Sequence, residues 1–140
     1  MILYLDTSSL IKLYVDEARC EPVRHAAAEA QRVVTCCVAY AEACAALERR
    51  RRSRDLDRGS FDRSVAALRR QWPLFTVTEV DEVAAGDLAL KHGLRGFDAI
   101  HLASAVTLSR APEVGDLLFS SFDERLNDAA TAEGLLLLAL

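Results

Sequence analysis

Four carboxylates occupy one kind of position in this 140-residue chain: each lies at or just past the end of an expected strand, or early in the helix that follows. They are Asp6, Glu42, Asp98 and Asp123. Strand ends of one polarity lie on one edge of a parallel sheet, so acids that are distant in the sequence can converge there. Such a cluster repels itself unless a divalent cation neutralises it. The four positions therefore predict a Mg²⁺ site suited to metal-assisted phosphodiester chemistry, in which the cation holds phosphate oxygens and activates water.

Three of these acids also have a purely structural explanation. Asp98 stands at an expected helix N-cap, Asp123 falls in an expected first helical turn, and Asp6 could cap the helix after the first strand. Ser121 and Glu124 fit a capping box, which would make that corner structural as well. Capping and metal binding are both open for these three acids.

Glu42 cannot be explained by capping, because it lies inside its expected helix. Its neighbours three and four positions away are Val38, Ala39, Ala45 and Ala46, so no cation of that helix can pair with it. A carboxylate on such a face is costly to bury unpaired. Either this face is exposed to solvent, or a group outside the helix satisfies Glu42.

Two further features could contribute to a site. His101, one turn after Asp98, could act as an acid, a base or a ligand, although a histidine among apolar residues is more typical of a packed, hydrogen-bonded side chain. Residues 49–54 hold five arginines that could bind a phosphate backbone. The alternative for this run is a solvated helix end, where the helix dipole favours cations.

The apolar pattern places these residues on alternating strands and helices. Strands are expected at residues 2–5, 33–35, 75–78, 117–120 and 135–138, which are short runs rich in apolar or β-branched residues. Helices are expected near residues 8–15, 18–31, 37–52, 60–72, 81–92, 99–109 and 123–132, with stops at Pro73, Gly93 and Gly134. Such alternation implies crossover connections, so we predict one α/β domain, residues 1–140, with a parallel sheet of about five short strands.

The composition is that of a globular protein, since 51% of the residues are hydrophobic and 27% are charged. The net charge of -4 gives no general attraction for nucleic acid, so an anionic partner needs a local basic patch or a bound metal. No stretch approaches the roughly 20 apolar residues that span a bilayer, and no signal peptide is visible, so we expect a cytoplasmic protein without membrane contact. The four cysteines lack a C-x-x-C pair and are expected to be free and buried.

Four sequence blocks resemble those of a known family. They are Leu3-Tyr-Leu-Asp-Thr-Ser-Ser-Leu10, Tyr40-Ala-Glu42, Phe97-Asp-Ala-Ile-His-Leu-Ala-Ser-Ala105 and Phe119-Ser-Ser-Phe-Asp-Glu-Arg-Leu126. In this order they resemble the four acidic blocks of PIN-domain ribonucleases of the VapC toxin type. The blocks span essentially the whole chain; the first and third are specific, whereas the second is short.

The resemblance implies a PIN-like three-layer α/β/α domain around the parallel sheet, and an endoribonuclease that depends on Mg²⁺ or Mn²⁺. It also implies an RNA substrate, a VapB-type antitoxin that blocks the site, and a homodimer. Transferred position by position, the catalytic and metal-binding acids would be Asp6, Glu42 and Asp98, with Asp123 as the fourth and Ser8 and Ser121 as supporting hydroxyls.

Two departures from the family pattern concern the fourth acid. The family usually has Thr where Ser121 stands, and a loop at residues 111–115 stretches the spacing between Asp98 and Asp123. The stretch makes Asp116 a rival. Asp116 precedes its expected strand instead of following it, so it should lie on the opposite edge of the sheet, and we favour Asp123.

Two other functions fit parts of the pattern. A catalytically inactive PIN-like protein could bind RNA or a partner, although all four acids are present. A phosphoacceptor signalling module also carries an acidic cluster after its first strand. Such modules resemble receivers with a lysine near the last strand, and this chain has only Lys12 and Lys91.

Overall fold

The fold is built around strand β1, Ile2–Leu5, which lies at the centre of a five-stranded sheet. The computed structural model describes residues 1–140. The strand order is β3-β2-β1-β4-β5, with β2 at Arg32–Cys36, β3 at Thr76–Thr78, β4 at Leu117–Ser120 and β5 at Leu136–Leu137. Every neighbouring pair of strands is parallel. The predicted parallel sheet of five short strands is therefore confirmed.

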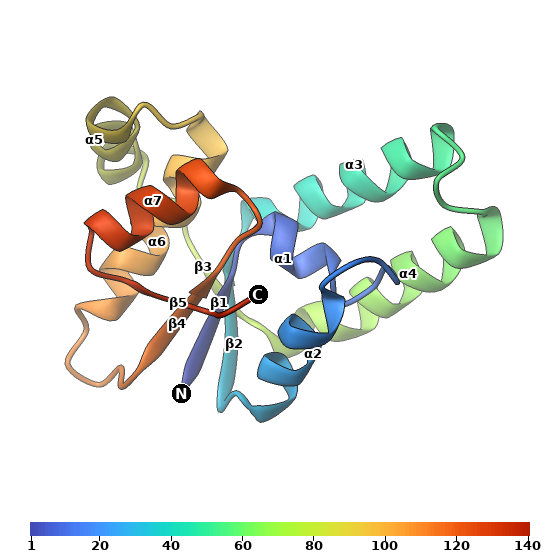
Figure 1. The fold of residues 1–140 in the computed structure, drawn as a ribbon, viewed down its shortest axis with the longest axis horizontal. Helices are drawn as coiled ribbons and strands as arrows, with labels where there is room; N and C mark the ends of the chain where they lie inside the picture. Colours follow the sequence, from blue (N-terminus) through green and yellow to red (C-terminus); the bar gives the residue numbers. More distant parts are fainter.

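Seven α-helices connect the strands. They are α1 Thr7–Ile11, α2 Cys20–Glu29, α3 Val38–Arg52, α4 Arg58–Gln71, α5 Glu82–His92, α6 Gly96–Ser109 and α7 Glu124–Ala132, and a short 3₁₀ helix, η1, covers Trp72–Leu74. Helices α5, α6 and α7 lie on one side of the sheet and α1 to α4 on the other, which gives the predicted three layers (Figure 1).

Strand β1 supplies side chains to both cores, because successive residues of a strand point to opposite faces. Ile2 and Tyr4 belong to the core shared with α6 and α7, whereas Leu3 and Leu5 belong to the core shared with α1, α3 and α4. All four are buried, which explains why β1 is a continuous apolar run without alternating polar residues. This central, doubly covered strand ends directly at Asp6.

Helices α3 and α4 form a hairpin that projects from the body of the domain (Figure 1). Leu47 of α3 and Leu68 of α4 are completely buried in the same core as α1. The turn between the two helices, at residues 53–57, is exposed except for half-buried Leu56. The hairpin carries most of the arginines of the chain.

The expected elements differ from the observed ones mainly at their ends. Helix α1 stops at Ile11 instead of residue 15, and α2 starts at Cys20 instead of residue 18. Backbone turns continue from Lys12 to Val15, and two side chains hold the segment that follows: Lys12 Nζ donates to the Ala18 carbonyl at 2.8 Å and Arg24 Nη2 to the Val15 carbonyl at 3.2 Å. All four cysteines are free; Cys20 and Cys36 are buried and the other two half-buried. None of the helices has the length and apolar character that crossing a membrane requires.

We predict that the docking of α7 depends on Leu126, which is fully buried. Leu126→Ala should lower the free energy of unfolding by about 2–5 kcal/mol, because it removes buried methyl groups and leaves a cavity. Chemical denaturation followed by circular dichroism measures the change. Leu90→Ala is the matched control: Leu90 is 88% exposed, so its loss should change stability by less than about 0.5 kcal/mol. Equal effects of the two substitutions would contradict the observed packing.

Candidate active site

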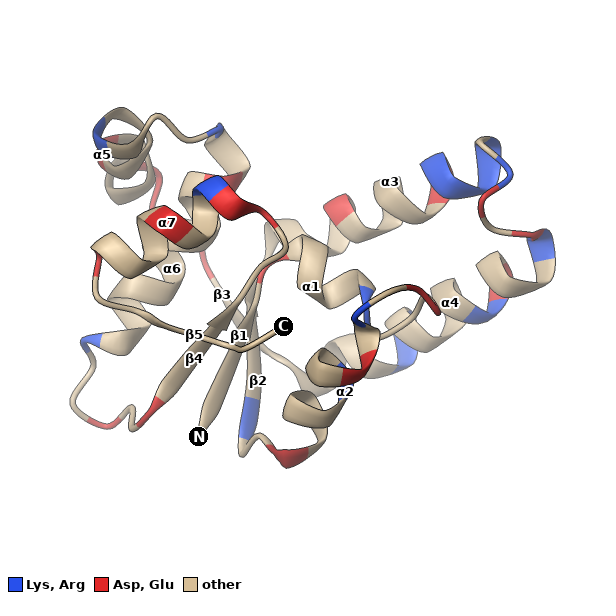
Figure 2. Ribbon diagram, viewed as in Figure 1, with Lys and Arg blue, Asp and Glu red and all other residues tan.

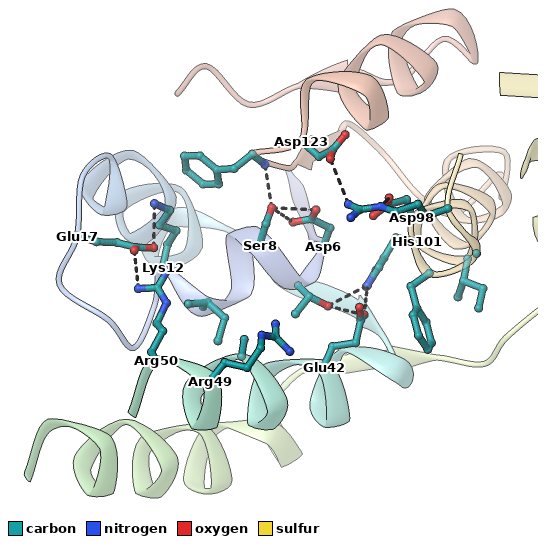
Figure 3. Close-up of a pocket in the computed structure, with 18 residues that line it drawn as sticks. Asp6, Ser8, Lys12, Glu17, Glu42, Arg49, Arg50, Asp98, His101 and Asp123 are labelled. Carbon is teal, nitrogen blue, oxygen red and sulfur yellow. Dashed lines mark hydrogen bonds and ion pairs between the residues drawn. The ribbon is translucent and has the colours of Figure 1, made fainter. Parts of the chain in front are cut away.

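All four predicted acids line one open cavity, of about 880 Å³, at the carboxyl edge of the sheet. Asp6 follows β1, Glu42 comes from α3, Asp98 from the first turn of α6, and Asp123 from the end of the loop after β4 (Figure 3). The expected convergence of acids from four distant segments is therefore observed. Asp116 lies elsewhere: it precedes β4, and its carbonyl accepts a hydrogen bond from the Ile2 amide at the amino edge of the sheet.

Asp6 is the most enclosed of the four acids, with only 4% of its surface exposed. Its Oδ1 accepts hydrogen bonds from the Ser9 amide and the Ser8 hydroxyl, both at 2.8 Å, and its Oδ2 accepts one from the Ser121 hydroxyl at 2.6 Å. Burial raises the pKa of Asp6 above its ordinary value, although the nearby His101 ring and these hydrogen bonds oppose the shift. Asp6 does cap α1, as its position allowed, and it also faces the cavity.

The two expected supporting serines hold Asp6 against the loop after β4. The Ser8 hydroxyl donates to Asp6 and accepts from the Phe122 amide at 2.9 Å. The Ser121 hydroxyl donates to Asp6 and accepts from the Asp123 amide at 3.0 Å. The predicted capping box is wrong, because the N-cap of α7 is Asp123 and not Ser121. Ser121 instead uses its hydroxyl on the carboxylate of Asp6.

Glu42 is satisfied from outside its own helix. Its Oε1 accepts a hydrogen bond from Thr7 Oγ1 at 2.7 Å and lies 3.2 Å from His101 Nε2, while His101 Nδ1 lies 3.1 Å from the Tyr4 hydroxyl. A ring protonated on Nε2 can donate to Glu42, and the Tyr4 hydroxyl lies within hydrogen-bond distance of Nδ1. Burial alone would raise the pKa of Glu42, but the hydrogen bonds from His101 and Thr7 outweigh it and lower the pKa below its ordinary value. Glu42 is therefore ionised at neutral pH.

His101 is the packed, hydrogen-bonded side chain that its apolar neighbours indicated, and its role as an acid, base or ligand stays a prediction. It is 2% exposed and packs edge-on against Tyr4, with the ring centroids 6.0 Å apart. Its Nε2 nevertheless reaches the cavity wall at Glu42. Thr7, which completes this contact, was not singled out in the sequence, because a threonine at the start of a helix has many structural roles.

Asp98 and Asp123 share a cation that sequence reasoning missed. Arg95 Nε lies 2.9 Å from Asp98 Oδ2, and Arg95 Nη2 lies 3.4 Å from Asp123 Oδ2. The expectation that Asp98 caps its helix is wrong, because α6 begins at Gly96 and its N-cap is Arg95. Asp123 is the N-cap of α7 instead of a first-turn residue, and its Oδ1 accepts from the Leu126 amide at 2.8 Å. The signal for Arg95 was its spacing of three residues from Asp98.

The donor set fits a hard divalent cation by its chemistry. Five carboxylate residues line the cavity, namely the four predicted acids and Glu17, which is already paired with Lys12 and Arg50. The Ser8 hydroxyl also faces the cavity, and no cysteine lines it. No three acidic, histidine or cysteine side chains stand close enough together to form a complete metal cage. Mg²⁺ does not need one, since it retains several waters and uses one or two carboxylates directly. These residues therefore suit a partly hydrated cation.

The arginine run divides between the helix end and the cavity. Arg51 and Arg52 pair with Glu48 at 2.7 and 3.0 Å, as expected for cations in the last turn of a helix. Arg50 pairs at 2.6 Å with Glu17, which also binds Lys12. Arg49 lines the cavity and makes no ion pair. One member of the run is thus free to bind an anion beside the acids.

Comparison with known proteins identifies relatives over almost the entire chain. Residues 3–132 match the family described as PIN domain. Ribonuclease VapC45 and Ribonuclease VapC49 from Mycobacterium tuberculosis are each 32% identical to this chain over 142 residues, which covers 95% of this chain and 92% of the relative.

Solved structures share the fold at lower sequence identity. PAE2754 from Pyrobaculum aerophilum superposes with a TM-score of 0.70 at 19% identity, covering 99% of this chain and 90% of that chain. A toxin-antitoxin complex from Klebsiella pneumoniae includes a chain with a TM-score of 0.60 at 17% identity, covering 86% of both chains. At these identities the likeness supports the fold alone.

We predict that Asp6→Asn stabilises the metal-free protein. The pKa of Asp6 is raised in the folded state, so above that pKa folding buries a charge that the neutral amide does not carry. In EDTA at neutral pH the melting temperature should rise by about 3 °C or more. The gain should disappear as the pH falls through the folded pKa toward the unfolded value near about 4, where both states of Asp6 are protonated.

The exposed Asp116 provides the control for this measurement. Asp116→Asn removes the same formal charge and should leave the melting temperature nearly unchanged at every pH. A destabilising effect of Asp6→Asn at neutral pH would mean that the hydrogen bonds to the carboxylate outweigh its burial.

Proposed function

Because the chain belongs to the PIN domain family, we propose that it is a metal-dependent endoribonuclease that hydrolyses RNA phosphodiester bonds. The observation that carries this proposal is the meeting of four acids from four separate segments in one open cavity. Relatives at 32% identity are named ribonucleases, which supports the choice of RNA. Asp6, Glu42, Asp98 and Asp123 are the proposed catalytic acids, with Mg²⁺ or Mn²⁺ as the cofactor.

The surroundings of each acid indicate a different role for it in the proposed reaction. When bound, the cation supplies charge for the phosphate oxygens and an activated water. Asp6 is held in one orientation by Ser8 and Ser121, so we assign it as the fixed ligand. Glu42 is a weak proton acceptor because its pKa is lowered, and it therefore suits an anionic ligand or a hydrogen-bond acceptor for water better than a general base. Asp98 and Asp123 have partly exposed carboxylates at the mouth.

The basic side of the cavity supports an RNA substrate. Residues 49–70 contain nine arginines and three aspartates, in a chain whose net charge is -4 (Figure 2). Arg49 lines the cavity, lies in the last turn of α3 and has no ion-pair partner. A phosphate backbone entering the cavity would therefore meet a free guanidinium opposite the acids.

We also propose a VapB-type antitoxin and a homodimer as protein partners. A structural neighbour of this fold was solved as a toxin-antitoxin complex, which supports the first partner. Exposed apolar side chains on α5, including Val83 and Leu90, and on the edge strand β5 support a protein interface. Suppression of RNA cleavage by an equimolar candidate antitoxin would identify the partner.

The proposed activity predicts that Asp98→Asn reduces RNA cleavage at least about 100-fold, because it removes one carboxylate charge from the cation site. Cleavage of RNA by the purified protein should require Mg²⁺ or Mn²⁺ and stop in EDTA. Asp116→Asn, at the opposite edge of the sheet, should retain activity. Full activity of Asp98→Asn or of the EDTA-treated protein would refute the proposal, whereas metal-independent RNA binding without cleavage would favour an inactive PIN-like binding protein.

Arg49 should contribute to RNA affinity and not to the chemical step. In the Asp98→Asn background, where RNA stays intact, Arg49→Ala should weaken RNA binding by about threefold to tenfold and lower the slope of log K against log salt by about one. Fluorescence anisotropy at several salt concentrations measures both quantities. Arg32→Ala, at the amino edge of the sheet, is the charge-matched control and should have little effect. Equal losses for both variants would assign the effect to net charge alone.

A further inference from the structure

The charges of the acidic cavity are balanced unequally. Asp6 has hydrogen-bond donors but no ion pair, and Glu42 has the His101 ring. Asp98 and Asp123 have one cation in common, Arg95, and no other. The same guanidinium also helps to lower the pKa of Glu42. Arg95 is therefore paired with two of the four acids, and it makes a smaller contribution than His101 at a third, Glu42.

The guanidinium of Arg95 contacts two of the carboxylates that are proposed to bind the metal. Its Nε and Nη2 contact one oxygen each of Asp98 and Asp123, so the guanidinium links the two carboxylates at the mouth of the cavity. Those contacts use Asp98 Oδ2 and Asp123 Oδ2, while Asp123 Oδ1 is occupied by the Leu126 amide. Each oxygen of Asp123 therefore has one donor, whereas Asp98 has a donor on Oδ2 alone, so a cation that binds these carboxylates must compete with the guanidinium of Arg95.

The guanidinium of Arg95 is also able to move away from Asp98 and Asp123. Its side chain is 78% exposed, and both of its ion pairs are open to solvent on one side. Such pairs are weak because water and salt screen them. The backbone of Arg95 is fixed as the N-cap of α6, but its side chain makes no capping hydrogen bond, so the guanidinium can swing away without disturbing the helix.

We propose that Arg95 is the resident counter-ion of the metal-free site, and that its guanidinium competes with a divalent cation for the carboxylates of Asp98 and Asp123. The inference rests on the proposed metal-dependent function. Arg95 prevents mutual repulsion of the acids when no metal is bound, and in doing so it competes with the metal. It is a positioning residue of the acidic site and lowers the apparent metal affinity.

Binding of Mn²⁺ in the absence of RNA tests the proposal directly, by isothermal titration calorimetry at low ionic strength. Arg95→Ala should bind Mn²⁺ about tenfold more tightly than the unmodified protein, because a competing cation has been removed. Arg95→Lys keeps the charge but not the forked contact with two carboxylates, and should fall between them. Arg110→Ala is the control: Arg110 lies at the other end of α6 and is 71% exposed, so affinity should change less than about twofold.

A second measurement uses the unmodified protein, and the variants Arg95→Lys and Arg110→Ala serve only to assign its arginine signals. The side-chain Nε–Hε signal of Arg95 in a ¹H–¹⁵N spectrum is identified by its loss in Arg95→Lys. Addition of Mg²⁺ should move this signal from its ion-paired position to that of a solvated arginine. The signal of Arg110 should not move.

The outcomes separate this inference from the proposed function. If the protein binds Mn²⁺ but Arg95→Ala binds it no more tightly, or if the Arg95 signal does not respond to Mg²⁺, the counter-ion role is wrong and the metal site stands. If neither the unmodified protein nor Arg95→Ala binds Mn²⁺ at millimolar concentration, the metal site and this inference both fail.

Discussion

A carboxylate buried without a cation is the constraint on which the rest of the site depends. Asp6 follows the central strand, and its two oxygens are reached by the Ser9 amide and the hydroxyls of Ser8 and Ser121. These donors come from α1 and from the loop after β4, so the carboxylate is satisfied only when β1 and β4 pair in register. Because burial still disfavours its charge, the folded protein retains an acid that a cation would stabilise.

A second buried polar network connects the site to the core. It runs from Glu42 through His101 to Tyr4, whose ring stacks on Phe119 at 5.6 Å. Tyr4 belongs to β1, which ends before Asp6, and Phe119 belongs to β4, which precedes Asp123. The same two strands therefore also hold the His101 ring that contacts Glu42. The packing of His101 against Tyr4 therefore also sets its polar contact, because it orients the ring so that Nε2 faces Glu42.

Acidic and basic side chains are concentrated in different parts of this protein. The net charge of -4 therefore describes neither the acidic side nor the basic side of the cavity. Acids gather where strands end, and arginines gather on the α3–α4 hairpin (Figure 2). Between them, Lys12 and Arg50 are neutralised by Glu17, which leaves Arg49 and Arg95 as the arginines with distinct roles at the cavity. Arg95 faces the acids directly, whereas Arg49 is free for an incoming anion.

The sequence by itself determined the parallel sheet and the convergence of Asp6, Glu42, Asp98 and Asp123, because apolar periodicity sets the strands and parallel topology places their ends on one edge. The three layers were expected from the resemblance to PIN-domain ribonucleases. The sequence also favoured Asp123 over Asp116 as the fourth acid, because Asp116 precedes β4. Only the tertiary structure decided which group satisfies each acid. Helix ends are set by local competition for hydrogen bonds, so the caps of α6 and α7 were misplaced by one to three residues. The contacts of Glu42 with Thr7 and His101, and of Arg95 with Asp123, join residues far apart in the chain, and their distances follow from side-chain packing that no spacing in the sequence encodes.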